Sequence, residues 1–415
     1  MMAMQRVLPP ILLAFLCLIP NAFAAYWDTL PAGVRAVVWR NVTTSSVQSE
    51  YSAKGQVSPY FFNLDLNAQT LSDMDPAFAD AFSYMASISP AAVEAFSAAK
   101  YEARGSAKAD VNGFGFGLGI TNRLSAYTSV PLYKAKVNIN FVRTSGDNFN
   151  QVQNSINASG SNNQLKPFYQ QVLGQLDDAS GPRIQKVLVD KLGYQPMGNW
   201  EAQGLGDVEL GMMYQLTQWT GSGLLLSGGV VLPTGRVDNP DILQDFGFGD
   251  GQTDVFLEFG GGSRVLNDWI SLDSWTRLTY QAAANKELRV AEDPDTLIGS
   301  EKGTFKEKLG NKFDFAVNAT FHATDWFELY TGYLYNYIGE SSYQSKHSLA
   351  NQFLQANTEQ EIHFLRGGFG ISTVELFKRG KFFLPMNTSF GVQKAIGGMN
   401  SPRYTRYDLE FRFFF

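Results

Sequence analysis

The final residues of the chain alternate strictly between apolar and ionised side chains. The apolar members are Tyr407, Leu409, Phe411, Phe413 and Phe415. Between them stand Arg406, Asp408, Glu410 and Arg412. Because successive side chains of a β-strand point to opposite faces, the pattern predicts a strand with one apolar and one charged face. A half-buried strand of a soluble sheet has the same pattern, so this segment alone leaves a soluble and a membrane setting open.

The same alternation returns along the whole chain and predicts an all-β fold. We expect strands at 33–45, 106–121, 124–143, 203–218, 223–236, 251–265, 268–283, 311–323, 326–339, 358–376, 381–395 and 403–415. Tyr60 to Leu66 is a further candidate, and since bacterial barrels have an even strand count, it would raise the total to fourteen. The prediction is therefore a transmembrane antiparallel β-barrel of about twelve strands, with fourteen as the alternative.

The connections between these segments alternate between short and long. Outer-membrane barrels have short turns on the periplasmic side and long loops outside. Three short turns carry Trp219, Trp269 and Trp326, where an aromatic girdle at one membrane surface is expected. The connections 46–105 and 144–202 are predicted to be long outer loops, partly helical because apolar residues recur in them at helical spacing.

The N-terminus indicates export. Residues 1–24 carry one cation, Arg6, followed by an apolar stretch and an Ala-x-Ala site. This pattern predicts a secretory signal peptide, so the barrel should occupy 25–415. Cys17, the only cysteine, lies within the signal peptide and leaves the barrel without thiol chemistry. Beyond it no run of about 18 apolar residues occurs, so we expect strands to cross the outer membrane of a Gram-negative bacterium.

Composition agrees with a membrane setting. Only 17% of the residues are charged and 14% are aromatic, with a net charge of -6. Soluble domains have about a quarter charged residues, so the lipid bilayer is the expected surrounding medium. The mild acidity and the lack of a Lys/Arg run exclude a nucleic-acid partner.

The charged strand faces predict the lining of the lumen, because the apolar faces would meet lipid. The candidates are Asp207, Glu209, Asp254, Glu258, Asp273, Arg277, Asp314, Arg406, Asp408, Glu410 and Arg412. Such groups need water or a partner of opposite charge, so the lumen is either wet or crossed by ion pairs. Twelve strands enclose more space than the eight that side chains fill, so a narrow channel is available. The alternative is that the charges only stiffen the wall.

Two loop segments have apolar stripes at helical spacing. Their members are Phe78, Phe82, Met85, Ile184, Val187 and Leu188. We expect these side chains to form an apolar vestibule in which a hydrophobic or amphipathic solute first lodges. The alternative is that the helices pack on each other and on the barrel rim as a lid.

Catalytic and metal chemistry have little support. The three histidines, His322, His347 and His363, lack the Ser two residues later that outer-membrane phospholipases and deacylases show. An enzyme would need His363 or His347 beside a nucleophile or carboxylate at the rim. The acids from Asp238 to Asp254 fit no EF-hand loop. We therefore expect no enzyme activity, no cofactor and no metal.

Three glycine-rich motifs carry a family resemblance. They are GLGDVELG at 204–211, LPTG at 232–235 and GFGDGQTDV at 247–255. They resemble outer-membrane proteins identified as transporters of phenol and aromatic-degradation pathways, and fatty-acid and aromatic-hydrocarbon channels are a more distant likeness. The strand that ends at Phe415 resembles the signature by which the barrel-assembly machinery recognises its substrates.

The resemblance implies passive uptake of small hydrophobic, aromatic or amphipathic solutes through the barrel. The alternative function is a non-conducting barrel whose outer loops bind an extracellular partner or a surface polymer. A lumen of continuous width would favour transport, and a lumen closed by salt bridges would favour the scaffold.

Overall fold

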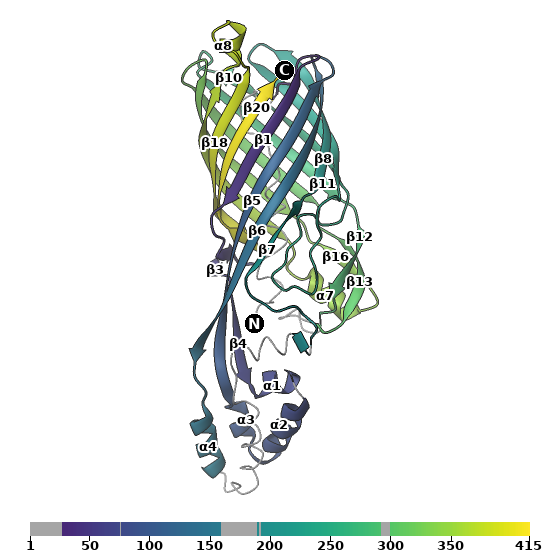
Figure 1. The fold of residues 1–415 in the computed structure, drawn as a ribbon, viewed down its shortest axis with the longest axis vertical. Helices are drawn as coiled ribbons and strands as arrows, with labels where there is room; N and C mark the ends of the chain where they lie inside the picture. Colours follow the sequence, from purple (N-terminus) through teal and green to yellow (C-terminus); the bar gives the residue numbers. More distant parts are fainter. Residues whose placement is uncertain (1–26, 75, 159–188, 191, 292–298) are drawn as a thin grey trace.

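A closed antiparallel barrel dominates the computed structural model, which describes residues 27–415 except 75, 159–188, 191 and 292–298 (Figure 1). In order round the barrel its strands are β1 (Arg35–Thr44), β5 (Ser97–Gly119), β6 (Leu124–Ser145), β8 (Val208–Trp219), β9 (Ser222–Leu232), β10 (Asp254–Val265), β11 (Ile270–Gln281), β14 (Lys312–His322), β15 (Phe327–Ile338), β17 (Gln360–Ser372), β18 (Met386–Met399) and β20 (Thr405–Phe414). β1 pairs with both β5 and β20, which closes the ring. The predicted twelve-stranded barrel is confirmed.

The barrel has two dissimilar ends. The tight turns between β5 and β6, β8 and β9, β10 and β11, and β14 and β15 lie with the C-terminus at the top of Figure 1. The turn from β17 to β18 holds the short helix α8 (Val374–Lys378) and lies at the same end. We call this the short-turn end and the opposite one the long-loop end.

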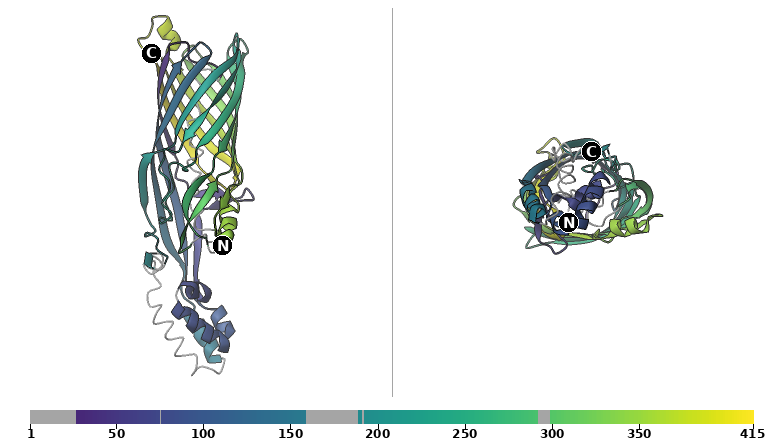
Figure 2. Two further views of the ribbon diagram at one scale, coloured as in Figure 1. Left: turned by 90° about the vertical axis from the view of Figure 1, so that its right-hand side faces the viewer. Right: turned by 90° about the horizontal axis from the view of Figure 1, so that it is seen from below.

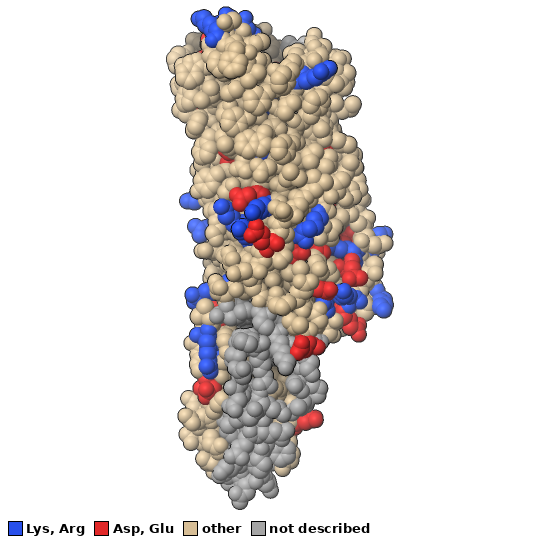
Figure 3. Space-filling model, viewed as in Figure 1, with Lys and Arg blue, Asp and Glu red and all other residues tan. Residues whose placement is uncertain are grey.

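The outer wall is apolar because the strands point their apolar side chains outward and their polar side chains into the barrel. On β10, Val255, Leu257 and Phe259 are exposed, whereas Asp254 and Glu258 face the interior. The tryptophans of three tight turns, 219, 269 and 326, are also exposed. Figure 3 shows the charged side chains gathered towards the long-loop end and few of them on the barrel wall above. An exposed apolar belt of this kind is stable only against lipid.

Two further strands belong to the sheet without adding to the barrel count. β7 (Trp200–Leu205) and β8 both pair with β6, at successive stretches of that strand. Gly206 and Asp207 separate β7 from β8. A Cβ at Gly206 would lie 2.2 Å from the Tyr133 ring, so this break requires glycine. β4 (Phe61–Asn67) pairs with β5 beyond the barrel wall. The strand suspected at Tyr60 to Leu66 therefore exists, but the fourteen-stranded alternative is wrong.

The long strands β5 and β6 continue past the wall, together with β4, as a stalk (Figures 1 and 2). The stalk carries a helical tip that consists of α1 (Ala68–Met74), α2 (Pro76–Ile88), α3 (Pro90–Glu94) and α4 (Phe149–Ala158). Residues 97–105, expected in the loop 46–105, are strand because β5 pairs with β6 along this stretch. No helix in the described ranges has both the length and the apolarity to cross a membrane.

Smaller elements line the long-loop end. β2 (Ser49–Tyr51), β3 (Val57–Pro59) and β19 (Ser401–Arg403) form one small sheet. β12 (Ala284–Arg289), β13 (Lys302–Lys308) and β16 (Ser342–Gln344) form another, which packs against α7 (Ser348–Gln355) through Phe305 and Ala350. These elements place charged loop residues beside the mouth of the barrel.

Candidate functional site in the lumen

The inward faces of the strands enclose two cavities. One, of about 570 Å³, lies towards the long loops and includes residues of the loop 232–254 in its lining. The other, of about 1570 Å³, lies towards the tight turns. We call them the long-loop cavity and the short-turn cavity. Their linings share Asp28, Thr29, Leu30, Met213, Arg412 and Phe414, so the two cavities are neighbours inside the barrel.

A network of buried ion pairs crosses the wall at the seam between the first and last strands. Asp408 of β20 accepts from Arg40 of β1 at 2.6 Å and from Arg406 at 2.7 Å. All three side chains are almost fully buried. Both guanidinium groups donate hydrogen bonds to the one carboxylate, and a buried site tolerates such charges only with close hydrogen bonds. Arg412 pairs with Glu410 at 2.9 Å nearby.

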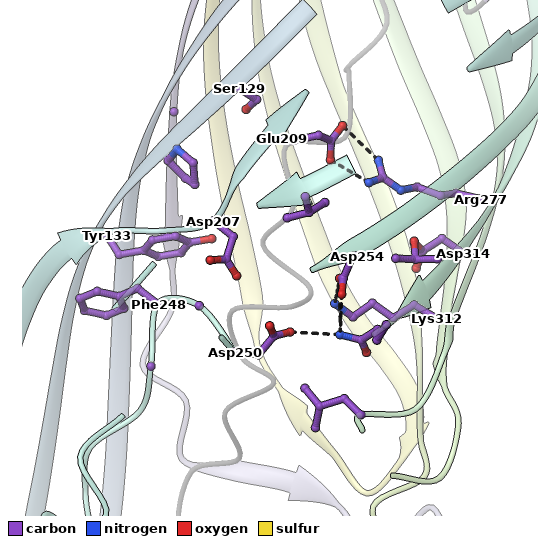
Figure 4. Close-up of a pocket in the computed structure, with 18 of the residues that line it drawn as sticks. Ser129, Tyr133, Asp207, Glu209, Phe248, Asp250, Asp254, Arg277, Lys312 and Asp314 are labelled. Carbon is purple, nitrogen blue, oxygen red and sulfur yellow. Dashed lines mark hydrogen bonds and ion pairs between the residues drawn. The ribbon is translucent and has the colours of Figure 1, made fainter. Parts of the chain in front are cut away.

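A second charged group lies in the long-loop cavity (Figure 4). Arg277 of β11 binds Glu209 of β8 at 2.7 Å and lies 3.7 Å from the ring centre of Phe256. The Tyr127 hydroxyl donates to the same Glu209 carboxylate at 2.7 Å. Asp314 accepts from the Asn336 amide at 2.5 Å. These contacts fix the side chains across a lumen that lipid surrounds.

Three further carboxylates face the same space around a single lysine. Figure 4 shows Asp207 and Asp250 turned towards one another, with Asp254 and Lys312 across from them. Lys312 Nζ lies 3.3 Å from Asp254 Oδ2. Asp207 accepts the backbone N–H of Gly235 at 2.8 Å, which ties the loop 232–254 to the break between β7 and β8. The LPTG motif thus folds against the GLGDVELG motif, and Asp207 is the link.

The structure places the predicted lumen residues in three settings. The long-loop cavity is lined by Asp207, Glu209, Asp254, Glu258, Arg277, Asp314, Glu410 and Arg412. The short-turn cavity is lined by Asp273 and again by Arg412. Arg406 and Asp408 line neither cavity, because the network with Arg40 holds them against the wall. A role of any of these residues in selectivity remains a prediction.

The predicted vestibule requires a correction. Phe78, Phe82 and Met85 lie on α2, but all three are buried in the core of the tip, where Phe82 meets Phe96 at 4.9 Å between ring centres. They line neither cavity, because a helical tip this small needs its apolar stripe for its own core. Ile184, Val187 and Leu188 lie outside the described residues.

Sequence reasoning missed the segment before β1. Trp27 is buried at the short-turn end, where its indole packs over Gly223 and Gly262. Its carbonyl accepts from Gln215 Nε2 at 2.9 Å, and Leu30 N donates to Ser125 Oγ at 2.9 Å. The two wall glycines were the available signal, since a side chain at either position would collide with the indole ring. The segment thus lies inside the barrel and lines the short-turn cavity.

A hydrogen-bonded series at the short-turn cavity was also missed. Ser271 Oγ lies 2.6 Å from His322 Nε2, and His322 Nδ1 lies 3.2 Å from Glu328. This is the contact order of a Ser-His-acid triad. Ser271 pairs with Arg264 on one side and Thr320 on the other. Its neighbouring backbone N–H groups are thus engaged in two ladders, which leaves no pair of them to hold an oxyanion.

No protein-family model matches the chain, and no curated protein matches it significantly. Among solved structures, an outer-membrane channel from Pseudomonas putida F1 is similar, with 12% identity and a TM-score of 0.52 over 95% of this chain and 100% of that one. A monoaromatic hydrocarbon channel has 11% identity and a TM-score of 0.35 over 99% and 92% of the two chains. A toluene transporter of Ralstonia pickettii has 8% identity and a TM-score of 0.37 over 92% and 90%.

The similarity to the Pseudomonas putida channel shows that the two proteins share a fold. The likeness to outer-membrane transport proteins that the glycine-rich motifs implied is therefore confirmed for the fold. A closed barrel with an apolar outer wall satisfies its backbone hydrogen bonds within itself and offers only apolar side chains to lipid. The chain is therefore a barrel of the outer membrane of a Gram-negative bacterium, with the fold of an outer-membrane channel.

Proposed function

We propose that the barrel is a channel for passive uptake of small hydrophobic, aromatic or amphipathic solutes. The observation that carries this proposal is the pair of neighbouring cavities inside the wall, whose linings have Asp28, Met213 and Arg412 in common. A solute that enters from the long loops would cross the first cavity, pass the segment at Trp27 and leave through the second. The Pseudomonas putida protein of similar fold is itself described as a channel, which agrees with this proposal.

The lining suits solutes with an apolar part. Phe248 stacks on Tyr133 with ring centres 5.4 Å apart, and Leu243 and Ile338 line the same cavity. Apolar walls with a few placed polar groups are typical of small-molecule sites. The monoaromatic hydrocarbon and toluene proteins named above suggest the size of such solutes, although these names apply to those proteins alone.

The direct test is single-channel conductance of the refolded protein in a planar bilayer, with and without small aromatic acids or fatty acids. Steady conductance that these solutes reduce would support the proposal. Circular dichroism and heat-modifiable migration must first establish that the sample is a folded barrel. A folded barrel that conducts no ions would contradict an open channel.

A scaffold that binds an outside partner is the second candidate. The observation that favours it is the stalk, which holds the helical tip far from the wall (Figure 2). The buried network at Asp408 also stiffens the barrel in the way a non-conducting scaffold would need. If the folded barrel conducts no ions, the scaffold becomes the favoured function.

We further propose the orientation and the route of assembly. The long-loop end and the tip would lie outside the cell, since outer-membrane barrels place short turns in the periplasm. Residues 1–24 would be removed as a signal peptide. The barrel-assembly machinery would recognise the strand that ends at Phe415, whose alternating aromatics support this proposal.

A further inference from the structure

The long-loop cavity has an excess of acceptors and negative charge. Twelve Asp and Glu side chains line it, against six Arg and Lys side chains. Several of the acids are neutralised locally, as Glu209 is by Arg277 and Asp254 by Lys312. Asp207 and Asp250 have no cation within 4.0 Å among the described residues. Both side chains are half-buried: Asp207 accepts the Gly235 N–H, and Asp250 accepts from Gln252 N and Gln281 Nε2. The two carboxylates therefore have hydrogen bonds but no counter-charge, which a positively charged group would supply.

A buried amide beside these carboxylates has one unused atom. Gln281 is fully buried, and its Nε2 donates to Asp250 Oδ2 at 3.0 Å and to Asp254 at 3.4 Å. Since ionised carboxylates only accept, the amide must turn its nitrogen towards them, which fixes its orientation. Its Oε1 then has no donor in the described structure. A buried acceptor without a donor costs about 1–3 kcal/mol, so this position favours a ligand that brings N–H groups.

A second glutamine repeats the pattern. Gln360, at the start of β17, is buried and lines the same cavity, and its Oε1 also lacks a donor among the described residues. Asp207, Asp250 and the two glutamines thus line one cavity in which carboxylates outnumber cations. A protonated primary amine supplies three N–H donors and one positive charge. It would therefore provide both the donors and the positive charge that the cavity lacks.

The apolar side of the cavity restricts the rest of the ligand. Tyr133 and Phe248 lie beside Asp207 in Figure 4, and Leu243 and Leu354 also belong to the lining. A small inorganic cation would leave this surface uncovered. An ammonium group joined to an apolar chain or ring would bury it, with a gain of about 25 cal/mol per Å² of apolar surface.

We infer that the long-loop cavity binds amphipathic primary amines, with the ammonium group between Asp207, Asp250 and Gln281 and the apolar part against Phe248. This inference rests on the proposed function and names the solute class that the channel prefers. It places the selective site in the long-loop cavity, so an amine would pause at the carboxylates before it reaches the segment at Trp27.

The test compares three solutes of equal length: hexylamine, 1-hexanol and hexanoate. Each is added to the long-loop side during single-channel recording. We expect hexylamine at pH 7 to reduce the conductance at a concentration at least about tenfold lower than the other two, as one charge-assisted hydrogen bond would give. Equal reduction by all three solutes would overturn the amine site and leave the channel function intact.

Three variants locate the effect. Asp207→Asn combined with Asp250→Asn keeps size and shape and should remove the tenfold preference. Gln281→Met tests the same site without altering the contact of Asp207 with Gly235, in case the double variant does not fold. Asp325→Asn, at an exposed ion pair with Arg379 at the short-turn end, is the control for the loss of a carboxylate outside the site and should retain the preference. An unchanged preference in both site variants would contradict the inference.

A barrel that conducts no ions would contradict the proposed function but still permit a decision on the site. Calorimetric titration of the wild-type protein in nanodiscs with hexylamine and with 1-hexanol then replaces the recording. Saturable binding of hexylamine alone, lost in the double variant, supports the site. Binding of both solutes with equal affinity, or of neither, rejects it.

Discussion

The single residues with the largest expected effect on the stability of this barrel are buried charged side chains. Asp408 is nearly inaccessible and holds two guanidinium groups, so its removal would take an ion pair from each of the buried residues Arg40 and Arg406. The sequence indicated Arg406 and Asp408 through their alternation with aromatics. It did not indicate Arg40, because the apolar run around that residue has no charged alternation and its contact depends on which strands meet at the seam.

We predict that Asp408→Asn destabilises the barrel by about 3–5 kcal/mol, the usual cost of breaking a buried ion pair. Denaturant unfolding in lipid vesicles, followed by tryptophan fluorescence, measures the loss. Glu375→Gln, in the exposed pair with Lys378, is the control and should cost less than about 1 kcal/mol. Equal stability of the two variants would show that the network at the seam contributes nothing.

At the scale of elements, the segment before β1 and the helical tip are the features that set this barrel apart. The strands were predictable because alternation and tight turns are local signals. The position of the tip was not, because its stalk depends on β5 and β6 remaining paired as far as Lys100. The apolar stripe of α2 was recognised, but a stripe alone cannot distinguish the core of a small domain from the lining of a vestibule.

The N-terminal segment should limit conduction. Trp27→Ala removes the indole that packs over Gly223 and Gly262, at a cost of about 3–5 kcal/mol for a buried aromatic. We predict that the segment then leaves the lumen and the unitary conductance rises. Thr29→Ala, which removes an exposed hydrogen bond to the Asn122 carbonyl, should leave the conductance unchanged. A Trp27 variant with wild-type conductance would mean that the narrow point lies elsewhere.

The tip should unfold independently of the barrel. Phe82→Ala creates a cavity against Phe78 and Phe96, with an expected loss of about 3–5 kcal/mol in a small core. Limited proteolysis with mass analysis should then show cleavage within 68–94, whereas heat-modifiable migration of the barrel persists. Tyr84→Ala, on the exposed side of α2, should resist cleavage as the wild type does. Loss of heat-modifiable migration in the Phe82 variant would show that the tip and barrel fold as one unit.

On the scale of the whole molecule, the apolar belt determines where the barrel can reside. Phe259 faces outward near the middle of β10 and pairs with Leu226 and Thr276. We predict that Phe259→Arg lowers the stability in bilayers by about 2–4 kcal/mol, the cost of a cation near the membrane midplane. Leu349→Arg on α7, which is as exposed but lies beyond the wall, should have little effect. Similar folding free energies for both variants would contradict the placement of the belt in lipid.

The overall architecture was largely predictable, and the site only in part. Alternation predicts which side chains face inward, and so it identified Asp207, Glu209 and Arg277 as a potential lining. It cannot predict which of them pair, because a contact such as that of Glu209 with Arg277 joins strands that are far apart in sequence. Gln281 and Asp250 were not singled out as lining residues, since their importance arises from the contact between them and from the Gln281 Oε1 that lacks a donor among the described residues.

The seam between β1 and β20 joins the two ends of the chain. Arg35 and Phe415 exchange both of their backbone hydrogen bonds, so the pairing of β20 with β1 closes the ring. Until then both terminal strands are open edges, which are templates for aggregation. The wall is therefore complete only when β1 pairs with both β5 and β20. We therefore expect the unfolded chain to need protection from other chains until the barrel closes. Pairing of β1 with β20 removes both open edges and with them the risk of edge-to-edge aggregation.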